Sequence, residues 1–114
     1  MGEVRITKKL YVYQLAYDYY NEEYMVKMDY FFAEDKGLYY EPIVVSHKLP
    51  ITQGDIQKKR LGKIWHWHYE TIVLEEPDCE KVKEIFMRMI NKRIQSLMHK
   101  MSKYEEMKIA VKNL

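Results

Sequence analysis

The chain has 114 residues, a formal net charge of +2 and a hydrophobic fraction of 47%. This length and apolar content indicate one folded domain, and no apolar run reaches the roughly 18 residues that a membrane helix needs. The single cysteine, Cys79, excludes an internal disulfide framework and a cysteine-rich zinc site. We therefore expect a cytoplasmic protein that does not enter a membrane and that needs no cofactor.

Residues 9–20 and 24–34 are predicted as two strands, because tyrosine and valine fit a pleated surface. The polar residues 21–23 separate them, and a helix across 10–33 is the competing prediction. Alternation places the apolar side chains of each strand on one face. On the first strand these are Tyr11, Tyr13, Leu15, Tyr17 and Tyr19. On the second they are Tyr24, Val26, Met28, Tyr30 and Phe32, with Lys27 and Asp29 on the other face.

The sequence Asp-Lys-Gly at 35–37 predicts a tight turn, because glycine takes positive φ at no steric cost. A third strand is predicted over 38–48. It contains Pro42, which cannot donate a ladder hydrogen bond. We therefore expect this strand to lie at an edge of the sheet or to be bulged at the proline.

Residues 49–63 are predicted as a loop and 64–74 as a fourth strand with strict alternation. One face of this strand would carry Trp65, Trp67, Tyr69, Thr71 and Val73. The other would carry Ile64, His66, His68, Glu70, Ile72 and Leu74. One aromatic face and one face with a polar centre indicate a sheet that is covered on one side only.

A long helix is predicted from Pro77 to the end of the chain. Pro77 suits the first turn of a helix, and the acidic side chains of Asp78 and Glu80 suit its positive end. Ser102 followed by Glu105 matches a capping box. The helix is therefore predicted either to break near Ser102 and restart, or to continue without interruption.

The fold class that follows is α+β, with a four-stranded, mainly antiparallel sheet and a long C-terminal helix in one domain. Residues 1–76 would form the sheet region and residues 77–114 the helical region. The apolar arc of the helix is wider than one sheet face covers. The residues at the centre of this arc follow one another in alternating steps of three and four, as in a helix–helix seam. These residues are Met87, Ile90, Ile94, Leu97, Met101 and Tyr104.

We therefore expect a homodimer that forms through the C-terminal helix. The competing hypothesis is a monomer in which the segment after Ser102 folds back over the same apolar residues.

His66, His68 and Glu70 would share one strand face, and two imidazoles with a carboxylate are ligands that zinc or ferrous iron accepts. Alternate residues of a strand lie about 7 Å apart, however, so these side chains converge only with help from their rotamers. A partly solvated sheet face is the interpretation we prefer. No metal site is therefore predicted, and added zinc is expected to leave the melting temperature unchanged.

Residues 46–63 carry five basic residues and one acidic residue, and two tryptophans follow closely. The basic candidates for phosphate contacts are Lys58, Lys59, Arg60 and Lys63. A net charge of +2 is small for a dedicated nucleic-acid-binding protein. We therefore prefer a solvated loop with Trp65 and Trp67 in the core, and we do not expect tight sequence-specific DNA binding.

Nine of the eleven tyrosines lie in the first 40 residues. Tyrosine is amphipathic and is enriched at protein interfaces, so these residues suit an interaction surface. A small core filled with tyrosine explains the same pattern equally well.

Catalytic motifs are weak. Cys79 is flanked by Asp78 and Glu80, which oppose its ionisation. An acid–base dyad of His68 and Glu70 is the form that catalysis would take.

The preferred function is a non-catalytic protein that binds a protein partner, such as a viral or mobile-element accessory protein that inhibits a host complex; this comparison rests on composition alone. The alternatives are a nucleic-acid-binding protein that uses the loop 57–63 and the helix, and a metal protein or enzyme that uses His66, His68 and Glu70.

Overall fold

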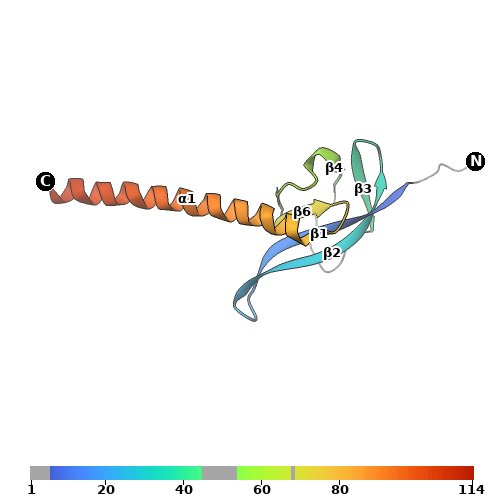
Figure 1. The fold of residues 1–114 in the computed structure, drawn as a ribbon, viewed down its shortest axis with the longest axis horizontal. Coiled ribbons are helices and arrows are strands. Elements are labelled where there is room, and N and C mark those ends of the chain that lie inside the picture. The colour runs from blue at the N-terminus through green and yellow to red at the C-terminus, as the bar shows by residue number, and fades with distance from the viewer. Residues whose placement is uncertain (1–5, 45–53, 68) are drawn as a thin grey trace, which may run out of the picture. The chain divides into compact units, whose positions relative to one another are not determined.

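The computed structural model describes residues 6–44, 54–67 and 69–114. In this part of the chain, one antiparallel sheet of six strands is followed by one α-helix (Figure 1). The α+β class is confirmed, but the expected number of four strands is not. The elements are β1 Thr7–Asp18, β2 Glu23–Asp35, β3 Tyr39–Val44, β4 Ile56–Gln57, the short 3-10 helix η1 Lys58–Arg60, β5 Trp65–His66, β6 Glu70–Leu74 and α1 Cys79–Lys112. The strand order across the sheet is β4-β3-β2-β1-β6-β5.

β1 and β2 form a long antiparallel hairpin, so the competing helix over 10–33 is wrong. The register runs without a break from Thr7 opposite Glu34 to Asp18 opposite Glu23. The turn between the strands is held by the Asp18 carboxylate, which accepts a hydrogen bond from the Tyr20 backbone N–H at 2.9 Å. The side chains that alternation placed on one face of each strand therefore face the same side of the sheet.

β3 is irregular at its proline, as expected. β2 pairs Phe32 with Val44 and Ala33 with Pro42, so the register shifts by one residue at this point. The chain enters β3 through a turn in which Gly37 has φ +95° and donates its N–H to the Asp35 carboxylate at 2.9 Å. β3 is not an edge strand along its whole length, because β4 pairs with its first two residues. The predicted extension of this strand over 45–48 lies outside the described residues.

The predicted strand over 64–74 is instead two short strands, β5 and β6. They pair with each other in antiparallel fashion, with Trp65 opposite Thr71 and His66 opposite Glu70. The chain therefore reverses between His66 and Glu70. This reversal is the reason why the fold has more strands than expected, together with β4, which lies in the segment predicted as a loop.

The main core lies on one face of the sheet. Val12 of β1 pairs with Val73 of β6, and Leu10 pairs with Phe31 of β2, so these side chains share that face. Trp67 and Leu61 pack against the cluster from outside. The cluster consists of Leu10, Val12, Phe31, Ala33, Tyr40, Ile56, Trp65 and Val73. The prediction that both tryptophans belong to the core is confirmed for Trp65, which is 7% exposed, whereas Trp67 is only partly buried and packs against the cluster.

The opposite face of the sheet is also covered at its centre, so the expectation of a sheet covered on one side only is wrong. Tyr13, Ile72 and Leu74 point to this second face and are buried. The Asp78 backbone N–H donates to the Tyr13 hydroxyl at 3.2 Å, which ties the start of α1 to β1. Burial of both faces makes β6 apolar at consecutive positions rather than at alternate ones.

α1 begins one residue after its cap. The Asp78 carboxylate accepts a hydrogen bond from the Lys81 backbone N–H at 3.0 Å, which is N-cap geometry. Pro77 therefore precedes the helix, and its predicted place in the first turn is wrong.

The predicted break near Ser102 is also wrong, and the prediction of an uninterrupted helix is confirmed. No glycine or proline lies between Cys79 and Lys112, and continuing a helix costs less than nucleating a second one.

The chain divides into two compact units, Met1–Val82 and Lys83–Leu114. The first unit contains the sheet and the first residues of α1, and the second contains the rest of the helix. Among the described residues, no helix combines the length and the apolar character that crossing a bilayer requires.

Candidate functional site

The clearest candidate site is a row of exposed apolar side chains along β2. Alternate residues of this strand face the same side of the sheet as Tyr13, but they lie outside the part of that face that is covered. The row consists of Tyr24, Val26, Met28, Tyr30 and Phe32. Each of these side chains is between 43% and 74% exposed. Over 30–33 the strand is apolar on both faces, because Phe31 and Ala33 point into the main core.

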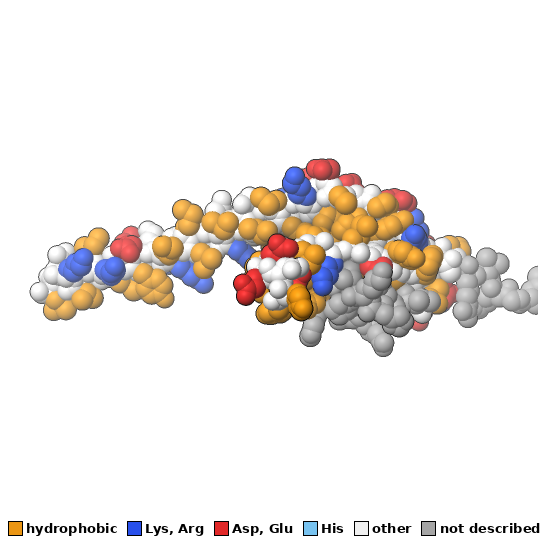
Figure 2. All heavy atoms as spheres, turned by 90° about the horizontal axis from the view of Figure 1, so that it is seen from below, with side chains coloured by type: hydrophobic (Ala, Val, Ile, Leu, Met, Phe, Trp, Pro, Cys, Tyr) orange, Lys and Arg blue, Asp and Glu red, His pale blue; other side chains and the backbone are white. Residues whose placement is uncertain are grey.

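β1 widens this row, because its register places a second set of partly exposed side chains beside it. Tyr17 lies opposite Tyr24, Leu15 opposite Val26, and Tyr11 opposite Tyr30. We call the combined area the aromatic surface. It consists of Tyr11, Leu15, Tyr17, Tyr24, Val26, Met28, Tyr30 and Phe32. Figure 2 shows hydrophobic side chains gathered over the strand region of the molecule.

Ring contacts hold several side chains of the aromatic surface in place. The rings of Tyr17 and Tyr24 meet edge to face with centroids 4.9 Å apart, and those of Tyr30 and Phe32 do so at 5.9 Å. Such pairs contribute about 0.5–1.5 kcal/mol beyond their buried area. The Lys9 ammonium lies 4.0 Å from the centroid of the Tyr30 ring, so one cation lies over the surface.

The sequence left open whether the tyrosines fill the core or form an interaction surface, and in the structure some are buried while others are exposed. Tyr13 and Tyr40 fill the interior, at 2% exposure each. Tyr24 and Tyr30 are exposed on the aromatic surface, and Tyr19 and Tyr20 are exposed in the turn next to it. Large apolar side chains gathered on an open face are typical of interaction sites in soluble proteins.

Two of the four basic candidates are engaged within the chain. Lys58 donates to the Asp35 carboxylate at 2.7 Å, and this contact, with the N–H of Gly37, holds the pKa of Asp35 below its usual value of 3.8. The Arg60 guanidinium stacks 4.0 Å from the centroid of the Trp65 ring. The Trp65 indole N–H also donates to the Arg60 carbonyl at 3.2 Å. The basic segment is therefore a structured part of the fold, not a free loop of cations.

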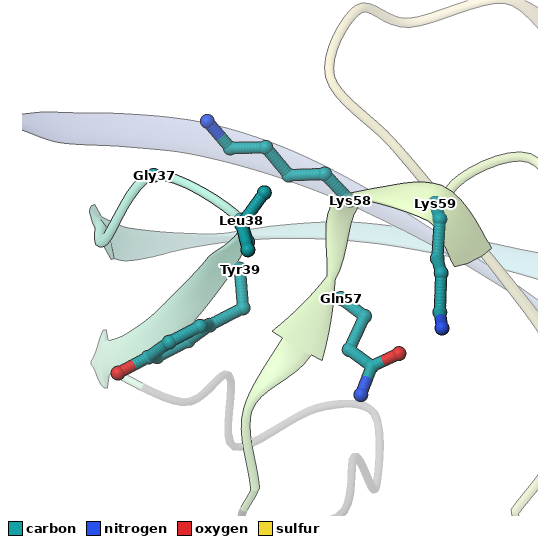
Figure 3. Close-up of a pocket in the computed structure, with 6 residues that line it drawn as sticks. All are labelled: Gly37, Leu38, Tyr39, Gln57, Lys58 and Lys59. Carbon is teal, nitrogen blue, oxygen red and sulfur yellow. The ribbon is translucent and has the colours of Figure 1, made fainter.

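A hollow of about 390 Å³ lies beside this segment, and the sequence did not predict it. The turn before β3 and the residues after β4 line it together, and these residues are Gly37, Leu38, Tyr39, Gln57, Lys58 and Lys59 (Figure 3). In Figure 3 the Lys58 side chain extends toward Gly37, whereas the side chains of Gln57 and Lys59 point the other way. Lys58 and Lys59 therefore point in different directions, whereas the lysines of a phosphate site would converge on one point.

The three metal candidates do not lie in a row on one strand. His66 and Glu70 are neighbours across the β5–β6 pair, with His66 Nδ1 2.6 Å from Glu70 Oε2. His68 lies outside the described residues. Among the residues that the structure describes, no group of three His, Cys, Asp or Glu side chains is placed to hold a metal ion. Cys79, the thiol candidate, is exposed.

Of the six helix residues proposed as a dimer seam, Ile90 is partly buried and the other five are open to solvent. Met87 and Ile94 are each 48% exposed, and Leu97, Met101 and Tyr104 are more so. The segment after Ser102 continues α1, so the fold-back that would hide these residues is wrong. Figure 2 shows hydrophobic side chains interspersed with lysine and arginine along the helix.

Comparison with models of known protein families, with curated proteins and with solved structures finds no match. The candidate function therefore depends on the geometry described above.

Proposed function

We propose that this protein is a non-catalytic binding protein that recognises another protein through the aromatic surface of β1 and β2. The observation that supports the proposal is the exposure of five consecutive alternate side chains of β2, all apolar, on one face of the strand. A partner that covers this face would gain the hydrophobic free energy that the folded chain leaves unused.

The composition of the surface favours a protein partner over a nucleic acid. Tyrosine, phenylalanine and methionine are enriched at the centres of protein interfaces, where charged residues are depleted. The aromatic surface contains only apolar side chains and tyrosines. Lys9 lies over the Tyr30 ring, with its ammonium group 4.0 Å from the ring centroid. A surface that bound a phosphate backbone would need several free cations.

Site-specific photocrosslinking in cells that express the full chain tests the proposal. A photoreactive phenylalanine analogue at Met28 reports on the aromatic surface. The same analogue at Lys27 is the matched control, because this neighbour is exposed on the opposite face of the same strand. We expect a discrete protein adduct from position 28 and none from position 27.

The adduct should disappear when Tyr30→Lys is combined with the probe at 28, while tryptophan fluorescence shows that the core around Trp65 is intact. Equal adducts from both faces, or an adduct that contains nucleic acid, would contradict the proposal.

A further inference from the structure

The second half of α1 contains an apolar surface that no described part of the chain covers. Every residue from Asn91 to Leu114 is exposed. The ion pairs on this helix, Glu84 with Arg88 at 2.8 Å and Glu105 with Lys108 at 3.9 Å, are solvent-exposed. Such pairs add only about 0.2–0.5 kcal/mol each, and helices in proteins are stabilised mainly by packing of an apolar face. A helix of this length therefore needs a packing partner.

The spacing of the apolar side chains identifies the kind of partner. Steps of three and four residues continue from Met87 past the predicted seam to Val111, and the one polar residue in the series is Lys108. The whole series is Met87, Ile90, Ile94, Leu97, Met101, Tyr104, Lys108 and Val111. A repeat of seven residues with two apolar positions is the pattern of a left-handed coiled coil.

We propose that α1 of one chain forms a parallel, in-register coiled coil with α1 of a second copy along this series. The inference is independent of the aromatic surface and goes beyond the proposed function. In heptad terms, the a positions are Met87, Ile94, Met101 and Lys108, and the d positions are Ile90, Leu97, Tyr104 and Val111. Each residue would then pack against its own equivalent, as two-fold symmetry requires.

Charge complementarity favours the second copy and its parallel orientation. Lys100 occupies heptad position g and Glu105 the following position e, so Lys100 of each chain would pair with Glu105 of the other. Symmetry produces this pair twice. In the antiparallel alignment that brings the whole series together, the two Lys100 side chains would instead face each other and repel.

Lys108, at heptad position a, fits the same arrangement. A single lysine at such a site fixes the register and the number of chains at a cost in stability. Its long aliphatic part can cover the seam while the ammonium group reaches solvent, where Glu105 of its own chain lies 3.9 Å away.

Sedimentation equilibrium of the full chain tests the dimer. We expect a dimer at tens of micromolar, and Leu97→Glu should weaken association by at least roughly 100-fold, because a charge would be buried in the seam. Gln95→Glu introduces the same charge on the outer face of the helix and should leave the dimer intact. Tryptophan fluorescence should remain native in both variants, because Trp65 and Trp67 lie among the strands.

A monomeric wild-type chain at these concentrations would overturn the dimer. Loss of the native tryptophan signal in Leu97→Glu would also overturn it, because Leu97 would then belong to the core of the monomer.

Disulfide trapping tests the orientation. Cys79 is exposed and is first replaced by serine. Val111→Cys in this background should form a disulfide-linked dimer on mild oxidation, because a parallel pair places the two thiols side by side. In an antiparallel pair, Val111→Cys would instead crosslink to Met87→Cys on a second chain. That mixed product, without the Val111 homodimer, would overturn the parallel arrangement.

Discussion

The strand region (Met1–Val82) and the distal helix (Lys83–Leu114) contain similar apolar side chains but differ in how far they bury them. Leu10, Val12, Phe31 and Ile72 are almost completely buried, although Leu10 and Ile72 lie 62 residues apart in the sequence. No residue from Met87 to Leu114 is buried. The sheet is therefore stabilised by contacts between distant segments, whereas the distal helix is stabilised within the chain by its own backbone hydrogen bonds.

This difference teaches that apolar content alone does not identify a core. The strand region also exposes apolar side chains, on the aromatic surface, but the other face of the same sheet is packed around Phe31 and Ala33. The helix has no such second packed face over 91–114. The comparison predicts that substitutions in the two regions will differ in size and in the signal that reports them.

The largest effect is expected in the core of the sheet. Phe31 is 1% exposed, and Phe31→Ala should lower the free energy of unfolding by about 3–5 kcal/mol, because it removes a buried ring and leaves a cavity. Urea denaturation followed by tryptophan fluorescence measures this change. Leu97→Ala in the helix should leave the same transition nearly unchanged, and a comparable loss there would contradict the division into two regions.

An effect of similar size but different location is expected in the helix. Ser96→Pro removes one backbone hydrogen bond and clashes with the preceding turn, which costs the helix about 3 kcal/mol or more. Far-ultraviolet circular dichroism should lose much of its helical signal, while tryptophan fluorescence stays native. Ser96→Ala is the control and should keep both signals. A simultaneous loss of both signals in the proline variant would show that the strands depend on the distal helix.

The smallest effect is expected at a single hydrogen bond in the strand region. The buried Tyr40 hydroxyl donates to Glu75 at 2.6 Å, and Tyr40→Phe should cost about 1 kcal/mol. Burial and this hydrogen bond raise the pKa of Tyr40 above its usual value of 10.0. Its contribution to stability is therefore complete below pH 10 and is lost as the pH rises toward the raised pKa.

Denaturation curves at neutral and alkaline pH measure this dependence. The stability difference between the wild type and Tyr40→Phe should shrink above pH 10, and a constant difference would contradict the assignment.

Much of the fold could be predicted from the sequence, because local signals determine much of it. Alternation in β1 and β2, the turn at Gly37, the bulge at Pro42 and the helix after Asp78 each depend on neighbouring residues. The helix and the spacing of its apolar residues were predictable for the same reason.

The remaining errors concern pairing between distant residues. An alternating pattern over 64–74 does not show that the chain reverses between His66 and Glu70. Nor does it show that β6 lies beside β1, where both of its faces are covered. Predicting the aromatic surface would have required the same knowledge of strand pairing, because composition alone could not separate the buried tyrosines from the exposed ones.

The place of β1 in the sheet has a consequence for synthesis on the ribosome. β1 pairs on one side with β2, which follows at once, and on the other with β6, where Leu74 lies opposite Tyr11. At about 5–20 residues per second, the hairpin waits roughly 2–8 s for β6 to be made. During that time the edge of β1 over residues 11–15, which later pairs with β6, is bare. The neighbouring Lys8 and Lys9 carry charges that discourage aggregation with other nascent chains.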